Sequence, residues 1–225
     1  VGFPSELAIF ERTVNTGIVG LILGVVYLVW LLNLFNFMDG TDGIAASEAI
    51  FVVLAGAFLN FHFLADAIHS AAAVILAAST FGFILYNWSP AKIFMGDVGS
   101  GYLGIVVAGL SLIAANQDPE LLWVWIILLA VFVSDATVTL IRRLLRKQKP
   151  HVAHRSHAYQ HLAIGLNSHA KVALLVLAVN IAWLLPIAFL VADKQLAGTT
   201  GVIIAYVPLL IAALAFGAGK DSATN

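Results

Sequence analysis

Long runs of apolar residues, separated by short polar segments, account for most of the chain. Seven of these runs reach or approach the roughly 20 mostly apolar residues that a helix needs to cross a lipid bilayer. They cover approximately Thr16–Phe37, Ile44–Phe61, Ile68–Asn87, Gly99–Ala115, Leu121–Leu144, Lys171–Ala192 and Thr199–Gly217. The runs are continuous and do not alternate polar with apolar residues, which favours helices over the strands of a membrane barrel. We therefore expect an all-α, polytopic transmembrane helix bundle that forms one domain over residues 1–225.

Composition supports a membrane protein and excludes several other classes. Of the residues, 61% are hydrophobic and 10% are charged, and the mean hydropathy is +0.99. A soluble fold of this length could not bury so much apolar surface, because the buried fraction grows slowly with chain length. The net charge of −1 gives no indication of nucleic-acid binding, and the absence of cysteine excludes disulfides and thiolate chemistry.

The distribution of lysine and arginine predicts the orientation in the membrane. With seven spans, the connecting segments alternate between the two sides. The segments near Asp39 and Lys92, residues 142–171 and the C-terminus then share one side, which holds every Lys and Arg except Arg12 and Lys194. Such an excess is typical of the cytoplasmic side. Three tryptophans near span ends are expected in the membrane interfaces, as is typical of this residue: Trp88, Trp123 and Trp125.

The segment NLFNFMDGTDGIA, residues 33–45, places polar residues where one predicted helix ends and the next begins. Four of them are spaced by three: Asn33, Asn36, Asp39 and Asp42. This spacing places them along one face of a helix that we expect to end near the adjacent glycines. Ionisable groups at the ends of membrane helices are costly unless hydrated or paired, so they often mark functional sites. Helix capping by Asp42 is the alternative, but it explains one residue of the four.

A second polar segment, IFMGDVGSGYLG, places Asp97 between glycines at the start of another predicted helix. A carboxylate here can hold Mg²⁺, which prefers oxygen ligands and keeps waters and substrate phosphates in its shell. A plain helix cap is the alternative. Neither acidic segment contains a lysine or arginine, and both are expected at the same membrane face. We therefore expect a divalent cation to balance the charge of Asp39, Asp42 and Asp97.

The third polar segment is basic and rich in histidine. It contains Arg142, Arg143, Arg146, Lys147, Lys149, His151, His154, Arg155, His157 and His161. A positive-inside signal with attraction to anionic lipid headgroups explains its first half. The run HRSHAYQH, residues 154–161, instead suggests a clamp for phosphate or diphosphate, because arginine can bind two oxygens at once. A zinc site is disfavoured because no carboxylate lies among these histidines.

Two isolated carboxylates lie within predicted spans. Asp135 is expected to face the interior of the bundle, and Glu48 is expected to interact with the dipole of its helix.

Three stretches that occur in this order resemble the cytoplasmic motifs of the polyprenyl-phosphate N-acetylhexosamine-1-phosphate transferases: NFMDGTDG, NWSPAKIFMGD and HRSHAYQHL. The resemblance covers nearly the whole chain and is closer to the branch that initiates O-antigen than to the peptidoglycan branch. It implies an enzyme that transfers a sugar-1-phosphate from a UDP-sugar to undecaprenyl phosphate and releases UMP. It further implies Mg²⁺ as cofactor, with Mn²⁺ as a substitute, and a bacterial inner-membrane location with a cytoplasmic active site. A homodimer is compatible with it.

The resemblance also implies roles for individual residues. Asp97 matches the family's magnesium aspartate, and Asp39 matches an essential active-site aspartate. Four residues match positions that line a uridine pocket: Gly40, Asp42, Asn87 and Phe94. His154, Arg155 and His157 lie in the segment associated with sugar or phosphate binding. Together with the residues singled out by spacing, the expected site has Asp39 and Asp42 as catalytic residues, Asp97 as metal ligand, and Asn33, Asn36, Gly40, Asn87, Phe94, His154, Arg155, His157 and His161 as substrate-binding residues.

The chain departs from the family pattern in two ways. The family carries an adjacent aspartate pair in an earlier cytoplasmic loop and has additional N-terminal spans, whereas this chain contains no Asp-Asp pair and starts at Val1. We therefore expect a C-terminal portion that lacks catalytic activity by itself. Thr41 also stands where leucine is common in the peptidoglycan branch, which weakens any assignment of the sugar.

Two other classes are alternatives. An intramembrane aspartyl protease also uses two aspartates, which share a proton and need no metal. A secondary transporter would place polar groups near the middle of the bilayer on broken helices. The protease is disfavoured because Asp39 and Asp97 are expected at helix ends with asparagines nearby, and the histidine segment would have no role in it. The transporter is disfavoured because the polar segments gather at one face.

Overall fold

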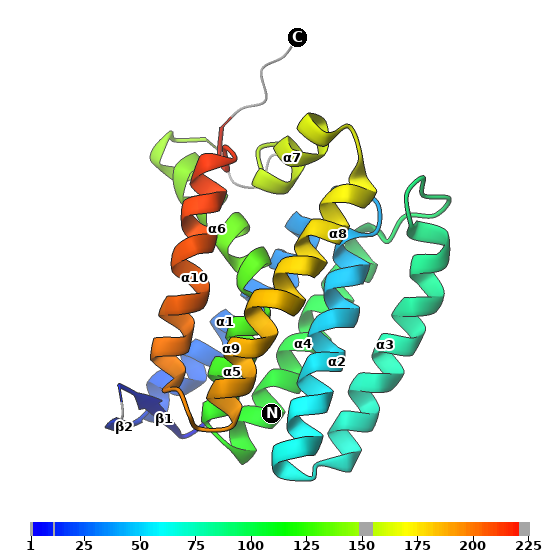
Figure 1. Cartoon of the computed structure of the whole chain (residues 1–225). Coiled ribbons are helices and arrows are strands. Elements are labelled where there is room, and N and C mark those ends of the chain that lie inside the picture. Colours follow the sequence, from blue (N-terminus) through cyan, green and yellow to red (C-terminus); the bar gives the residue numbers. More distant parts are fainter. Residues whose placement is uncertain (1, 11, 149–154, 221–225) are drawn as a thin grey trace.

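The protein is a bundle of membrane-length helices preceded by a short hairpin (Figure 1). The structure, a computed structural model, describes residues 2–10, 12–148 and 155–220. The hairpin pairs β1 (Glu6–Ile9) with β2 (Arg12–Asn15) in antiparallel register. No strands were expected in this part of the sequence. The helical elements that follow are α1 (Gly17–Met38), α2 (Ile44–Leu64), α3 (Ala67–Asn87), α4 (Gly96–Gln117), α5 (Glu120–Leu128), α6 (Ala130–Leu145), α7 (Ala158–Leu166), α8 (His169–Val179), the π-helical turn η1 (Asn180–Leu184), α9 (Leu185–Ala192) and α10 (Gly198–Ala215).

The predicted helix bundle is confirmed, and the protein is a multi-pass membrane protein. Among the described residues, six helical stretches are long and apolar enough to cross a membrane, and a bent pair supplies a seventh. Each corresponds to one of the seven apolar runs. The run expected at Lys171–Ala192 begins two residues earlier, at His169, and continues through η1 into α9.

The run expected at Leu121–Leu144 is not one straight helix. It breaks at Leu129 into α5 and α6, which meet at an angle of 73°. No proline or glycine stands at the break, so local sequence does not set it. The break follows from packing: α5 lies against α9 and α10, whereas α6 lies against α10 and α1.

Two glycines allow close contacts in the core. A Cβ at Gly104 of α4 would lie 2.2 Å from the carbonyl oxygen of Leu31, so α1 and α4 can approach closely only without a side chain there. A Cβ at Gly56 of α2 would lie 2.3 Å from the Trp125 ring. Trp125 is fully buried. The expectation that it lies in the membrane interface is therefore wrong, because Gly56 leaves room for its ring inside the bundle.

A buried polar pair connects α2 to η1. Asn180 Nδ2 donates a hydrogen bond of 2.5 Å to Glu48 Oε2, and both side chains are at most 1% exposed. Glu48 was expected to interact with the dipole of its own helix, but its described partner is this amide on another element. The pair fixes α8–α9 against α2 below the loop that joins α1 to α2.

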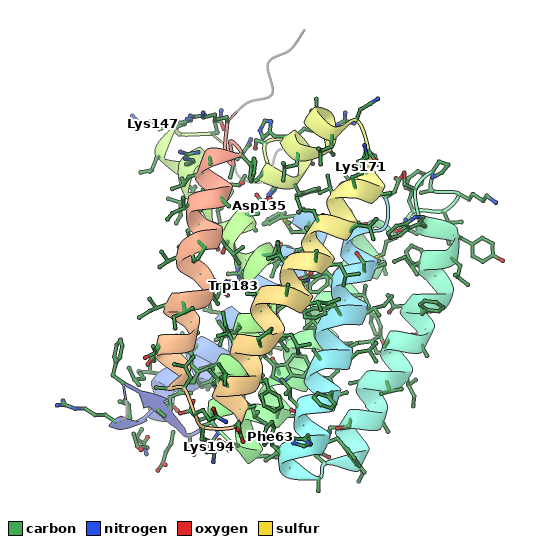
Figure 2. The ribbon with its side chains drawn as sticks, viewed as in Figure 1. Phe63, Asp135, Lys147, Lys171, Trp183 and Lys194 are labelled. Atoms are coloured by element: carbon green, nitrogen blue, oxygen red, sulfur yellow. The ribbon has the colours of Figure 1, made fainter. Side chains whose placement is uncertain are left out.

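The polar segments gather at one end of the bundle, here called the site end. The α1–α2 loop, the α3–α4 loop, α7 and the start of α8 lie there (Figure 1). Lys147 and Lys171 mark this end, whereas Lys194 lies at the opposite end (Figure 2).

Candidate active site

The loop between α1 and α2, residues 39–43, forms the centre of the candidate active site. Gly43 has φ of +76°, a left-handed conformation that favours glycine. A Cβ at this position would also lie 3.0 Å from the Trp88 ring. The chain therefore turns tightly into α2, and residues 40–42 are left between two cavities.

Asn87, the last residue of α3, fixes this loop to the one that follows it. Its Oδ1 accepts the Gly43 N–H at 3.0 Å, and its Nδ2 donates to the Ile93 carbonyl at 2.9 Å. The side chain is 3% exposed. Because both ends of the amide are bonded to backbone, Asn87 sets the relative position of two segments that line the site.

The first cavity, here called the acidic cavity, has a volume of about 230 Å³. It brings together residues from α1, the two loops and the start of α4. Among the described residues, its lining contains three carboxylates and no lysine, arginine or histidine. Most of the site expected from the sequence lines it: Asn36, Asp39, Gly40, Asp42, Asn87, Phe94 and Asp97, together with Thr41, Met95 and Gly96.

Asp97 lies in the first turn of α4 and does not act as a helix cap. Its Oδ1 accepts a hydrogen bond of 3.1 Å from Asn36 Nδ2, which also lies 3.3 Å from Ser100 Oγ. Partial burial, and then the negative charge of Asp97, raise the pKa of Asp39 from 3.8 to about 7. A cation between these carboxylates would therefore relieve an unfavourable charge interaction.

The carboxylates of the acidic cavity suit Mg²⁺, which shares its ligands between protein and substrate, better than they suit a metal ion held by protein side chains alone. The described residues contain no group of three or more His, Cys, Asp or Glu side chains arranged to hold a metal ion. Mg²⁺ in phosphate-handling sites takes one or two carboxylates and fills its remaining positions with water and substrate oxygens. Asp97, with Asp39 beside it, can provide that number of protein ligands.

Asp42 holds three segments together. Its Oδ2 accepts the Ala91 N–H at 3.2 Å and lies 3.2 Å from Nδ1 of His169, the first residue of α8. Its own N–H donates to the same Nδ1 at 3.3 Å. The N-cap position of α2 is Gly43, and no side chain caps that helix. Capping therefore does not account for Asp42.

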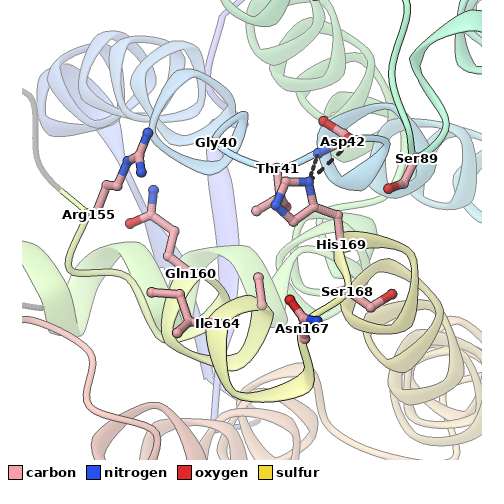
Figure 3. Close-up of a pocket in the computed structure, with 11 residues that line it drawn as sticks. Gly40, Thr41, Asp42, Ser89, Arg155, Gln160, Ile164, Asn167, Ser168 and His169 are labelled. Carbon is pink, nitrogen blue, oxygen red and sulfur yellow. Dashed lines mark hydrogen bonds and ion pairs between the residues drawn. The ribbon is translucent and has the colours of Figure 1, made fainter. Parts of the chain in front are cut away.

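The second cavity, here called the polar cavity, lies on the other side of residues 40–42 and has a volume of about 570 Å³ (Figure 3). It shares Gly40, Thr41 and Asp42 with the acidic cavity. The rest of its lining comes from Ser89, Arg155, α7 and the start of α8: Gln160, Ala163, Ile164, Asn167, Ser168 and His169. The positively charged guanidinium of Arg155 thus belongs to the cavity that adjoins the acidic cavity with its three carboxylates.

Only part of the histidine segment, residues 154–161, lines the cavities, although all four of its predicted site residues were expected there. Arg155 lines the polar cavity, but His157 and His161 line neither cavity. His157 is 3% exposed, and its Nδ1 lies 3.2 Å from Asp135 Oδ1. His161 Nε2 lies 3.2 Å from the Lys220 carbonyl oxygen. His154 falls outside the described residues.

Asp135 positions α7 at the site end. From within α6 it accepts the N–H groups of Ala158 and Tyr159, each at 2.9 Å, as well as contacting His157. The expectation that Asp135 faces the interior of the bundle is confirmed, since it is 5% exposed. Tyr159 in turn donates a hydrogen bond of 3.1 Å to the carbonyl of Phe37, next to the central loop.

Sequence reasoning missed several residues of the polar cavity. His169, Gln160, Asn167 and Ser89 line it, although none was expected in the site. His169 follows the N-cap residue Ser168, so its sequence context indicates only the start of a helix. Asn33 was expected but lines neither cavity, because its Nδ2 donates to the Val29 carbonyl of its own helix at 2.7 Å.

Comparison with known proteins places this architecture in a family. Residues 3–115 match the model of glycosyl transferase family 4, so the chain belongs to that family. A probable undecaprenyl-phosphate N-acetylglucosaminyl 1-phosphate transferase of Bacillus subtilis is 37% identical over 158 residues, which cover 69% of this chain and 44% of that protein.

Two further relatives carry related names. A phospho-N-acetylmuramoyl-pentapeptide-transferase of Corynebacterium kroppenstedtii is 32% identical over 162 residues, covering 63% of this chain and 43% of the relative. A decaprenyl-phosphate N-acetylglucosaminephosphotransferase of Mycobacterium leprae is 28% identical over 178 residues, covering 69% and 44%. The chain thus spans less than half the length of these curated relatives.

Proposed function

We propose that this chain carries the donor site of a polyprenyl-phosphate sugar-1-phosphate transferase. The reaction moves a sugar-1-phosphate, of N-acetylhexosamine type, from a UDP-sugar to undecaprenyl phosphate and releases UMP. One observation carries the proposal: three carboxylates, with no basic residue among the described lining, line one cavity, and an arginine lines the cavity beside it. Names of relatives that contain polyprenyl phosphates and N-acetylated sugars support the substrate class.

The chemistry requires positioning and charge balance more than proton transfer. An oxygen of the lipid phosphate attacks the β-phosphorus of the nucleotide sugar, and the bond from that phosphorus to the bridging oxygen of the α-phosphate breaks. UMP leaves with that oxygen, and the lipid carries the sugar through a diphosphate. The attacking phosphate is already ionised near neutral pH, so no base has to remove a proton from it.

The residues of the acidic cavity would then have distinct roles. Asp97 and Asp39 would hold Mg²⁺ or Mn²⁺, and Asn36 orients Asp97 through its hydrogen bond. When bound, the ion supplies positive charge to the diphosphate as charge develops on the departing UMP. Asp42, Gly40, Asn87 and Phe94 form the wall that we assign to the uridine.

The location follows from the two substrates. The acceptor has an apolar tail, which suits a site at the end of a membrane bundle, and the donor is a cytosolic nucleotide sugar. We therefore place the site end at the cytoplasmic face of a bacterial inner membrane. Initiation of O-antigen or a related cell-envelope polysaccharide is the role that the motifs favour.

The two alternative classes receive no support from the geometry. Asp39 and Asp97 lie at helix ends rather than within facing helices, and the side chain of Asp97 accepts a hydrogen bond from the Asn36 amide. Family membership also disfavours an aspartyl protease and a transporter.

The proposal is tested with the whole protein, a panel of UDP-N-acetylhexosamines and undecaprenyl phosphate. We expect Mg²⁺-dependent release of UMP together with a lipid-linked sugar phosphate. Asp97→Asn and Asp39→Asn should each reduce the rate at least a hundredfold, whereas Asp193→Asn in the exposed turn at the opposite end should not. Full activity of both site variants would overturn the assignment.

A further inference from the structure

The acidic cavity is too small to hold a whole nucleotide sugar. Its volume of about 230 Å³ lies below the roughly 300–1,000 Å³ of typical small-molecule sites. The polar cavity adds about 570 Å³ and shares residues 40–42 with it. A donor whose diphosphate lies by Asp97 therefore has room to extend past Thr41 into the polar cavity.

The lining of the polar cavity suits a sugar with hydroxyl and acetamido groups. Gln160, Asn167 and Ser168 carry side chains that can donate and accept hydrogen bonds, and Ala163 and Ile164 add an apolar wall. Arg155 is the cationic side chain among the described lining residues apart from histidine. This combination favours a neutral or acidic N-acylated sugar over one with a free ammonium group.

His169 occupies the boundary between the two cavities. Its Nδ1 lies 3.3 Å from the backbone N of Asp42 and 3.2 Å from the Asp42 carboxylate, so it can accept a hydrogen bond from the first or, when protonated, donate one to the second. Its other ring nitrogen faces the side of the cavity formed by Arg155 and Gln160 (Figure 3). The side chain is 43% exposed, and no described residue bonds Nε2. One edge of the ring is thus fixed by the protein and the other is presented to a ligand.

The family resemblance already associates the segment that contains Arg155 with sugar or phosphate binding, and Arg155 lines the polar cavity. We propose that His169, which the resemblance does not include, contacts the sugar through Nε2 while Nδ1 holds Asp42 in place. This inference rests on the proposed function. It assigns His169 two separable tasks, one on each side of residues 40–42: recognition of the sugar and positioning of a residue in the nucleotide wall.

Two substitutions separate these tasks. Asparagine places its amide near the position of Nδ1 but does not reach Nε2, whereas glutamine reaches the position of Nε2 and leaves that of Nδ1 empty. The control is Lys171→Ala, an exposed residue two positions further along α8 that lines neither cavity. Binding of UMP, UDP-N-acetylglucosamine and UDP-N-acetylgalactosamine to the whole protein in detergent is measured by calorimetry with Mg²⁺ present.

We expect His169→Asn to bind UMP within about twofold of the wild type and to lose about tenfold in affinity for the UDP-sugar that the wild type prefers, the effect of one hydrogen bond. His169→Gln should keep more of the sugar's contribution but bind UMP more weakly. Lys171→Ala should match the wild type with all three ligands.

Other outcomes overturn the inference. Equal losses for UMP and UDP-sugar in His169→Asn would mean that His169 only positions Asp42. A wild-type chain that binds UMP but gains no affinity from either sugar would remove the sugar subsite, while the proposed function would stand. A wild-type chain that binds none of the nucleotides would count against the proposed function itself. Thermal unfolding of each variant checks that it is folded as the wild type is.

Discussion

At the scale of single residues, Gly40 shows how tightly α7 is docked on the central loop. A Cβ at Gly40 would lie 2.2 Å from the hydroxyl oxygen of Tyr159, which is 3% exposed and bonded to the Phe37 carbonyl. Gly40→Ala should therefore cost about 1–3 kcal/mol of stability, as overpacking usually does, and should weaken UMP binding. Thermal unfolding and calorimetry measure the two effects.

The matched control for this substitution is Gly82→Ala. Nothing lies within 4 Å of a Cβ at Gly82, which is inside α3, so alanine there should leave stability unchanged or slightly raised. If Gly40→Ala behaved like Gly82→Ala, the contact between the central loop and α7 would not be as close as the structure has it.

The raised pKa of Asp39 predicts a pH-dependent affinity for cations. With a pKa of about 7, this carboxyl is roughly one-tenth ionised at pH 6 and nine-tenths at pH 8. Affinity of the chain for Mn²⁺, measured by electron paramagnetic resonance, should therefore rise up to about tenfold across that interval. In Asp39→Asn the affinity should be lower and this rise should disappear. A rise of the same size in the variant would assign the titration to another group.

The same shift has a definite sign for stability. The unfolded chain loses the Asp39 proton near the ordinary pKa of 3.8, while the folded chain keeps it until about pH 7. This residue therefore makes the metal-free protein less stable as pH rises from about 4 to about 7, and a bound cation opposes the loss.

The residues of the acidic cavity could be predicted from the sequence, but those of the polar cavity mostly could not. Asp39, Asp42 and Asp97 are charged residues beside glycines in an apolar chain, so they are conspicuous. His169 lines the polar cavity because the turn after α7 brings the start of α8 next to Asp42, a contact between residues far apart in sequence. His157 belongs to a conspicuous motif, yet it packs against Asp135. Motif membership does not determine the direction of a side chain.

At the scale of elements, α7 depends on one carboxylate of another helix. Asp135→Ala would leave the N–H groups of Ala158 and Tyr159 without their acceptor, at a cost of about 1–3 kcal/mol for each buried group. We expect α7 to detach, so that limited proteolysis cleaves between residues 155 and 168 faster than in the wild type.

Asp135→Asn is the graded control, because its remaining carbonyl oxygen can accept one of the two bonds. It should lie between the wild type and Asp135→Ala in both proteolysis and thermal unfolding. Equal protection of all three proteins would show that packing, rather than the two hydrogen bonds to Asp135, holds α7 in place.

The helices themselves differ in how far local pattern determines them. The apolar runs predict α1 to α4 and α10 within a few residues, since bilayer-length hydrophobicity is a local property of sequence. The 73° break at Leu129 depends on contacts with α9, α10 and α1, which local pattern does not contain. The burial of Trp125 similarly depends on Gly56, which is distant in sequence.

At the scale of the whole molecule, the orientation of the bundle decides whether the site can meet a cytosolic donor. The 225 residues contain no cysteine, so a single cysteine introduced at an exposed position of either end is the one thiol of this part of the protein. Lys171→Cys marks the site end, and Gln195→Cys marks the end that holds Lys194. In intact bacteria, a membrane-impermeant maleimide should label Gln195→Cys directly but label Lys171→Cys only after permeabilisation. The reverse pattern would place the acidic and polar cavities outside the cell, away from nucleotide sugars, and the proposed donor would have no access to its site.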